Sequence, residues 1–152
     1  MNLINKSVLF IDNSDSDFTG FDINTPKVRG TESSLILLAE SFVKKNISVR
    51  VLTEVDNEVL CNGVTYSNKH KHKDNDYSLC IAISNANLFS NIKSDKKIVW
   101  SNSLQPFEKF LRKKQLIPFL KYKPEVVTMC NYQYNNRSFL TSMFGKHMIS
   151  LS

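Results

Sequence analysis

The sequence predicts a single α/β domain over residues 1–152, built around a mostly parallel β-sheet. Short apolar runs rich in β-branched residues recur along the chain, and amphipathic or proline-initiated segments lie between them. Strands that are apolar along their whole length, rather than alternating with polar residues, are typical of parallel sheets covered on both faces. A chain of 152 residues also matches the usual size of one domain with its own core.

The first third of the chain contains the clearest alternation of strand and helix. Ser7–Ile11 is predicted to be a buried strand, and a polar loop follows over residues 12–30. Loops of this length in a compact domain tend to be functional or disordered. Thr31 is a good N-cap candidate for an amphipathic helix over Glu32–Lys45. A second strand is expected at Ser48–Thr53.

The rest of the chain continues the same alternation. The expected elements are a hairpin at Val59–Tyr66 with an Asn62-Gly63 turn, an exposed loop at Asn68–Asp76, strands at Tyr77–Ser84, Lys97–Trp100 and Glu125–Cys130, and helices at Asn85–Ile92, Pro106–Lys114 and Asn135–Phe144. Pro118 is expected to break the helix that precedes it. Lys146–Leu151 fits either a sixth strand or a linker. Alternating strands and helices predict a three-layer sandwich of Rossmann-like type.

Hydropathy and cysteine spacing exclude several protein classes. The longest apolar runs fall far short of the ~18 residues of a membrane-spanning helix. The N-terminal segment has only the run Val8–Ile11, whereas a signal peptide needs roughly 7–15 apolar residues. We therefore expect a cytoplasmic protein. Cys61, Cys80 and Cys130 are odd in number and widely spaced, which predicts packed thiols rather than disulfides or a zinc site.

Positive charge is concentrated in the second half of the chain. Residues 1–76 hold 9 basic and 11 acidic side chains, whereas residues 77–152 hold 11 and 3. The basic residues cluster at Lys93–Lys97 and Lys109–Lys123, and the second cluster mixes them with apolar residues. This pattern fits a solvated surface or peripheral contact with the inner face of a membrane. No RNP-like motif, zinc-finger spacing or basic heptad region is present, so we expect no nucleic-acid partner.

The segment Arg29-Gly30-Thr31-Glu32 is the best candidate for a ligand site. It lies between the first strand and the first helix, where open α/β sheets bind ligands and helix amides favour anions. Chemically it suits a phosphate or a diphosphate. The dinucleotide glycine fingerprint and the P-loop motif are both absent, so no bound cofactor is predicted.

Several segments, in order and spacing, resemble the amino-terminal domain of a family 4 type, GT-B fold glycosyltransferase. The segments that carry the resemblance are Arg29-Gly30-Thr31-Glu32, Leu37-Leu38-Ala39-Glu40, Lys44-Lys45-Asn46, Val49–Thr53, Asn62-Gly63-Val64 with Tyr66, Trp100-Ser101-Asn102, and Val126–Cys130 with the loop Asn131–Asn136. They resemble the glycine-rich turn, first helix, second strand, central loops and final strand of that domain. The resemblance covers nearly the whole chain.

The resemblance implies a function and a set of site residues. It implies the acceptor-binding, N-terminal half of a GT-B fold, with the donor-binding C-terminal domain absent from residues 1–152. The partners it implies are a nucleotide-sugar donor and a glycan or lipid-linked acceptor. By resemblance, Arg29, Gly30 and Thr31 would face the donor diphosphate, and Glu32, Asn102 and Ser103 would face the acceptor. No catalytic residue, metal or cofactor is assigned.

Each of these features also has a plainer interpretation. The chain could be a truncated, non-catalytic Rossmann-like module that binds a sugar, an anionic ligand or a protein. Glu32 could simply balance the helix dipole, and Gly30 could serve a tight turn. His70 and His72, flanked by lysines, suit a solvated loop better than a metal site.

Overall fold

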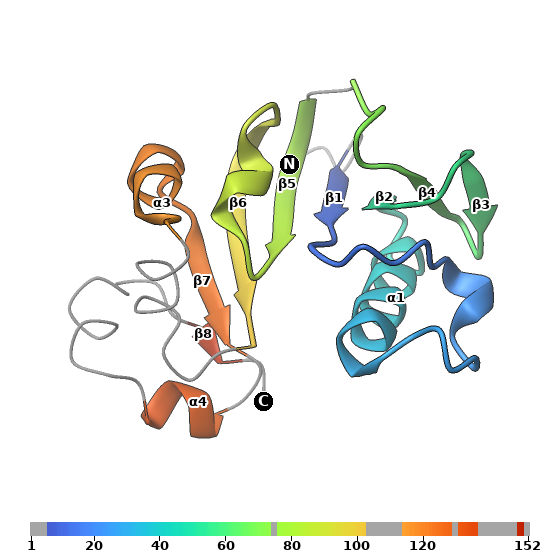
Figure 1. The fold of residues 1–152 in the computed structure, drawn as a ribbon, viewed down its shortest axis with the longest axis horizontal. Helices are drawn as coiled ribbons and strands as arrows, with labels where there is room; N and C mark the ends of the chain where they lie inside the picture. Colours follow the sequence, from blue (N-terminus) through green and yellow to red (C-terminus); the bar gives the residue numbers. More distant parts are fainter. Residues whose placement is uncertain (1–5, 74–75, 103–113, 129–130, 137–148, 151–152) are drawn as a thin grey trace.

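A computed structural model describes residues 6–73, 76–102, 114–128, 131–136 and 149–150. Strands alternate with helices at the start and at the end of these residues, with four consecutive strands between (Figure 1). The strands are β1 (Ser7–Ile11), β2 (Ser48–Thr53), β3 (Val59–Cys61), β4 (Val64–Asn68), β5 (Asp76–Ile83), β6 (Lys93–Ser101), β7 (Glu125–Thr128) and β8 (Ile149–Ser150). The α-helices are α1 (Gly30–Val43), α3 (Leu116–Tyr122) and α4 (Asn131–Asn135), and the 3₁₀-helices are η1 (Gly20–Asp22) and η2 (Ala86–Phe89). The predicted α/β class is therefore confirmed.

The strands form one mostly parallel sheet in the order β3-β4-β2-β1-β5-β6-β7-β8. Among the described strands every neighbouring pair is parallel except β3 with β4. The chain first builds outward from β1 through β2 to β4, and then crosses to β5 on the other side of β1. A topological switch point therefore lies between β1 and β5, an arrangement compatible with a Rossmann-like fold.

Both faces of β1 are packed, because its side chains alternate between two apolar clusters. Val8 and Phe10 belong to the cluster that contains Leu35 and Ile36 of α1. Leu9 and Ile11 belong to the opposite cluster, formed with Ala86 and Phe89 of η2 and Phe119 of α3. The continuous apolar sequence of β1 therefore reflects a strand covered on both sides, as the pattern predicted.

The first two strands and the hairpin turn are confirmed. β1 and β2 have the predicted bounds. Asn62 and Gly63 join β3 to β4 with φ angles of 49° and 79°, the left-handed backbone that a two-residue hairpin turn requires. A methyl group added at Gly63 would also lie 2.6 Å from Val43 of α1, so space as well as backbone conformation demands glycine there.

The predicted start of α1 is wrong by two residues. The helix begins at Gly30, and Arg29 occupies the N-cap position that we expected at Thr31. The reason is that Glu32, at the third helical position, accepts a hydrogen bond from the Arg29 backbone amide at 3.2 Å. This contact is one half of a capping box, and it satisfies a terminal amide without a hydroxyl cap. The helix ends at Val43, close to the predicted end.

Pro118 does not break a helix, contrary to the prediction. It lies at the third position of α3, which runs from Leu116 to Tyr122. The first amides of a helix have no partner within it, so proline loses no hydrogen bond there and its fixed φ suits the first turn. The next residue, Lys123, is the C-cap that ends the helix, and its backbone is left-handed with φ 45°.

Several other boundaries differ from the predictions. β6 starts at Lys93, four residues before the predicted strand, since its parallel ladder with β5 begins at the pair Asp76 and Lys93. The predicted helix over Asn85–Ile92 is the shorter 3₁₀-helix η2. The loop expected after β7 contains the helical turn α4, whereas most of the helix predicted over Asn135–Phe144 lies outside the described residues. The helix predicted at Pro106–Lys114 also lies almost entirely outside them.

Cys61 and Cys80 are buried free thiols, as predicted. Burial raises the pKa of both, to about 12 for Cys80. A thiol that stays protonated at neutral pH is a poor nucleophile, so both residues serve packing. Cys130 lies outside the described residues.

Candidate functional site

A cavity of about 490 Å³ lies at the carboxyl edge of the sheet, at the switch point between β1 and β5. Four chain segments meet around it: the start of the loop after β1, the start of α1, the end of β5 and the residue after β6. The lining residues are Asp12, Asn13, Ser14, Arg29, Gly30, Thr31, Glu32, Ile83, Ser84 and Asn102. Five of the six residues singled out from the sequence are therefore brought together, and Ser103 lies outside the described residues.

Arg29 and Glu32 form an ion pair on the helix side of the cavity. Arg29 Nη2 donates to Glu32 Oε1 at 3.0 Å, while the Arg29 amide donates to Oε2. The side chain of Arg29 is 72% exposed, whereas that of Glu32 is 4% exposed. The guanidinium can therefore turn toward a ligand in solvent, but the carboxylate is fixed by the helix start.

Gly30 contributes open space rather than a special backbone. Its φ is not positive, and a methyl group added there would meet no atom within 4 Å. The interpretation that a tight turn requires this glycine is therefore wrong. As the first three helical residues, Gly30, Thr31 and Glu32 have backbone amides without partners inside α1. These amides lie at the positive end of the helix dipole.

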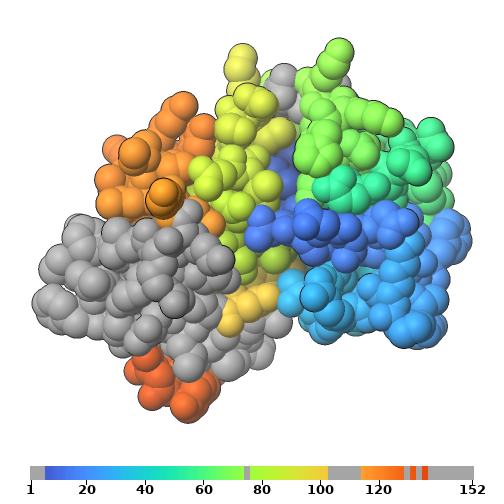
Figure 2. All heavy atoms as spheres, viewed as in Figure 1, coloured from blue at the N-terminus to red at the C-terminus, as the bar shows by residue number. Residues whose placement is uncertain are grey.

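Asn102 reaches the cavity from the residue after β6. Its Nδ2 donates to Thr31 Oγ1 at 2.9 Å, although the two residues are 71 positions apart. Figure 2 shows the end of β6 (yellow) against the start of α1 (light blue). Trp100, two residues earlier, is buried in the core.

The sequence interpretation missed Asp12, the first residue after β1. Asp12 is 2% exposed, and its Oδ2 accepts hydrogen bonds from the Ser14 amide at 2.9 Å and from the Ser14 hydroxyl. Burial raises the pKa of Asp12, and the nearby charge of Glu32 adds to the increase. A polar residue placed directly after a buried parallel strand is the signal that could have identified it.

Ser84 was missed as well, and its backbone is unusual. It follows β5 with φ 55°, a left-handed conformation that costs a non-glycine residue roughly 1 kcal/mol. Its amide donates to the Trp100 carbonyl at 2.9 Å, which holds the end of β5 against β6. Asn85, next in sequence, donates to Asn13 at 2.8 Å and links β5 to the loop after β1.

Lys69 contacts the loop that follows Asp12. Its Nζ donates to the Ser14 carbonyl at 2.7 Å and pairs with Glu54 at 2.6 Å. His70 Nε2 also contacts Glu54, at 3.0 Å. His72 Nε2 lies 3.1 Å from the Tyr77 hydroxyl, so the two histidines have separate protein partners. The described residues contain no group of three or more potential metal ligands.

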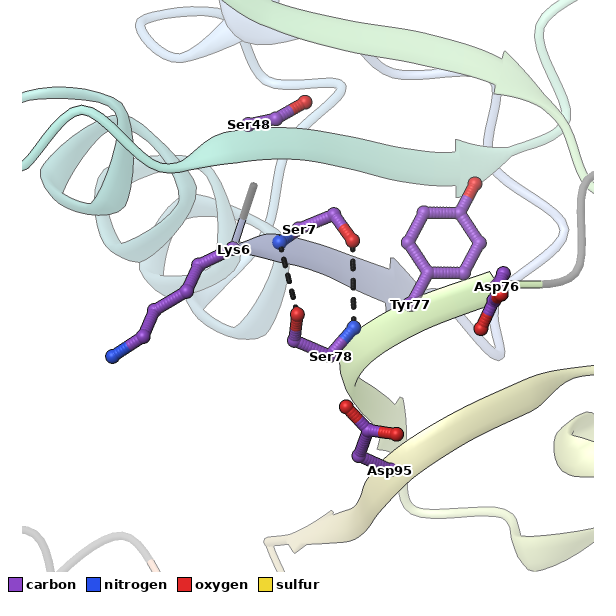
Figure 3. A pocket seen from close by; sticks show the side chains of 7 residues that line it. All are labelled: Lys6, Ser7, Ser48, Asp76, Tyr77, Ser78 and Asp95. Atoms are coloured by element: carbon purple, nitrogen blue, oxygen red, sulfur yellow. Dashed lines mark hydrogen bonds between the residues drawn. The ribbon is translucent and has the colours of Figure 1, made fainter. Parts of the chain in front are cut away.

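A second cavity, of about 460 Å³, lies at the opposite, amino edge of the sheet (Figure 3). Its acidic residues, Asp76 and Asp95, are exposed. Ser7 and Ser78 exchange hydrogen bonds between backbone amide and side-chain hydroxyl at 3.3 and 3.4 Å. These bonds continue the β1–β5 pairing, so both hydroxyls are already used by the protein.

Comparisons of the chain with protein-family models, with curated proteins and with solved structures found no match. In the part of the chain that the structure describes, no helix is long and apolar enough to cross a membrane. Any function must therefore be argued from the geometry of the carboxyl-edge cavity.

Proposed function

We propose that the carboxyl-edge cavity binds a sugar, and that the chain acts as the acceptor-binding half of a glycosyltransferase. The observation that carries the proposal is the convergence of Arg29, Gly30, Thr31, Glu32 and Asn102 on one cavity at the switch point of the sheet. Open α/β sheets bind their ligands at this place. The same residues, in sequence, resemble a glycosyltransferase site.

The proposed chemistry moves a sugar from a nucleotide diphosphate to a hydroxyl of the acceptor. Negative charge grows on the leaving diphosphate in the transition state, and the free amides of Gly30 and Thr31 with the mobile Arg29 side chain would stabilise it. Glu32, Asn102 and Ser103 would hold acceptor hydroxyls. Asn102 can donate or accept a hydrogen bond, but it cannot carry a proton at neutral pH.

The finer architecture belongs to the proposal. We place the chain as a three-layer, Rossmann-like N-terminal half of a GT-B fold, working in the cytoplasm. A second domain would supply most of the donor site. Supporting this view, helical elements cover β1 from both sides and the cavity opens at the edge where a second domain would meet it.

Binding can be tested by titrating the ¹⁵N-labelled chain with nucleotide sugars and with acceptor glycans. We expect amide shifts at Gly30, Thr31 and Asn102, with little change at Ser7 and Ser78 of the other edge. Thr31→Val, which removes the hydroxyl bonded to Asn102 while keeping the helix, should weaken the shifts. Shifts confined to the amino edge, or no shifts with any glycan, would contradict the proposal.

A non-catalytic sugar-binding module is the second candidate. The observation that favours it is that Arg29, the cation of the cavity, is already paired with the buried Glu32. Turnover separates the two candidates. The glycosyltransferase proposal expects sugar transfer when a donor-binding domain is supplied and none by residues 1–152 alone, whereas a binding module gives no transfer in either case.

Peripheral membrane contact is the proposed role of the Lys109–Lys123 cluster. In its described part, Ile117 and Leu120 of α3 are 78% and 56% exposed and lie three positions apart, on one face of the helix. Exposed Lys121 and Lys123 adjoin them. This combination suits an anionic lipid surface. Co-sedimentation with phosphatidylglycerol vesicles should fall in Ile117→Ser/Leu120→Ser, and equal binding by both forms would contradict the role.

A further inference from the structure

Asp12 lines the carboxyl-edge cavity, and a role in the turn after β1 does not by itself account for this position. Its amide donates to the Leu52 carbonyl at 3.0 Å, which extends the β1–β2 ladder by one residue. The backbone is therefore held as firmly as the strand. Asp12 is one of the residues that line the cavity, although it is almost completely buried. The side chain thus starts from a fixed backbone at the wall of the space that a ligand would fill.

The two carboxylate oxygens of Asp12 have different surroundings. Both hydrogen bonds from Ser14 reach Oδ2, and the structure describes no hydrogen bond to Oδ1. The cation on this side, Lys69, pairs with Glu54 and Asp15 instead. Within the described residues, Asp12 therefore has no ion-pair partner, and one of its acceptor atoms is left for a ligand.

The charge of the cavity decides which ligand fits this oxygen. Asp12 and Glu32 carry two carboxyl groups, and Arg29 is paired with Glu32. A diphosphate placed beside Asp12 would meet a carboxylate that forms no ion pair among the described residues and that feels Lys69 only at longer range. A neutral hydroxyl would instead donate a hydrogen bond to it, and hydrogen bonds to charged acceptors are among the stronger ones in proteins.

We propose that Asp12 is a ligand-binding residue of this cavity and accepts, through Oδ1, a hydrogen bond from a hydroxyl of a neutral saccharide. The inference rests on the proposed function and sharpens it, because it makes the β1 side of the cavity a subsite for uncharged sugar. Anions are then confined to the α1 side, beside Arg29 and the helix amides. The competing explanation is that Asp12 only shapes the turn through Ser14.

Asparagine at this position separates the two explanations. In Asp12→Asn the side-chain oxygen can still accept from Ser14, so the turn is kept, while the charged acceptor is lost. Asp95→Asn, in the amino-edge cavity, is the matched control. The probes are the methyl glycosides of glucose, galactose and mannose, and inorganic pyrophosphate. Binding is followed by amide shifts at Gly30 and Thr31.

The wild-type chain should bind at least one methyl glycoside at the carboxyl edge, and Asp12→Asn should raise its Kd about tenfold. Asp95→Asn should leave that Kd unchanged. Pyrophosphate should bind Asp12→Asn at least as well as wild type, because a repelling charge has been removed. Asp12→Ala, with the turn contact also deleted, should lose saccharide binding at least as strongly as Asp12→Asn.

The contrary outcomes are distinct. A saccharide Kd within twofold of wild type in folded Asp12→Asn would reduce Asp12 to a turn residue and leave the proposed function standing. Weaker binding of pyrophosphate by Asp12→Asn than by the wild-type chain would overturn the neutral subsite, because it would mean that the Asp12 carboxylate favours the anion. Absence of shifts with all of the probes would overturn the proposed function, and the inference with it.

Discussion

The carboxyl and amino edges of the sheet both carry acidic side chains and serines around a cavity, but they hold them differently. At the carboxyl edge Asp12 and Glu32 are buried, and each accepts two hydrogen bonds. At the amino edge Asp76 and Asp95 are exposed (Figure 3). There the hydroxyl oxygens of Ser7 and Ser78 each accept a hydrogen bond from the backbone amide of the other residue, on the neighbouring strand.

This difference follows from the direction of the parallel strands. Every βα connection returns a helix N-terminus, with its free amides, to the carboxyl edge, whereas helices end toward the amino edge. Buried carboxyl groups need hydrogen-bond donors to offset the loss of hydration, and at this edge Ser14 in the loop and Arg29 at the helix start supply them. The fold therefore concentrates buried, hydrogen-bonded carboxyl groups at the carboxyl edge of the sheet and leaves those of the amino edge in solvent.

The largest effect is expected from Glu32→Ala. It removes a buried acceptor from the Arg29 amide and breaks the ion pair, and it should lower the free energy of unfolding by about 2–3 kcal/mol. Asp95→Ala, at the exposed amino edge, should change it by less than about 0.5 kcal/mol. Urea unfolding of both variants measures the difference, and equal losses at the two edges would show that the carboxyl groups of the two edges contribute equally to stability.

Gly20→Ala tests how firmly the loop between β1 and α1 is anchored. A methyl group at Gly20 would lie 2.8 Å from Cys61 Sγ and 3.2 Å from the Tyr66 hydroxyl. Because Cys61 and Tyr66 are buried in the β3–β4 hairpin, overpacking should cost about 1–2 kcal/mol and loosen the loop. Thermal unfolding and amide exchange of residues 13–19 would show it, and a stability equal to wild type would argue that the loop is free to move.

Asp12→Asn should raise the free energy of unfolding at neutral pH. The gain should be smaller than the losses expected for Glu32→Ala and Gly20→Ala. Burial raises the Asp12 pKa above its ordinary value of 3.8, so the native state holds this proton more tightly than the unfolded chain does. The stability that this bound proton contributes is present below about pH 3.8, and it is lost as the pH rises from there through the raised pKa of the folded state. The Tm of Asp12→Asn should exceed that of wild type near pH 7, and the gap should close on acidification. A lower Tm near pH 7 would contradict this sign.

Ser78→Ala should have the smallest effect. It removes the hydroxyl that accepts from the Ser7 amide at 3.3 Å, a long and partly exposed bond. We expect a loss of about 0.5 kcal/mol in the free energy of unfolding and no change in ligand shifts at Gly30. A change in those shifts would mean that the two edges are coupled through β1.

Local patterns in the sequence predicted much of the fold. The strands β1 and β2 follow from apolar runs, and the hairpin follows from the Asn62-Gly63 turn, since both signals act over a few residues. The failures have local causes too. We expected Pro118 to end a helix. When the helix start is unknown, a proline that breaks a helix cannot be told from a proline that lies in its first turn. The start of α1 was displaced because Glu32, not Thr31, supplies the capping contact.

The α/β class and the polar segment at Arg29–Glu32 could be predicted from local sequence patterns, because periodicity and turn chemistry are short-range properties. Which polar residues meet at the cavity depends instead on long-range strand order. Asn102 bonds to Thr31, and Ser84 lines the same cavity as Asp12, because the chain crosses β1 before it builds β5 and β6. The strand order is set by contacts between residues far apart in sequence. It makes Asp12, in sequence only the first residue of a polar loop, one of the two buried acidic residues of the cavity.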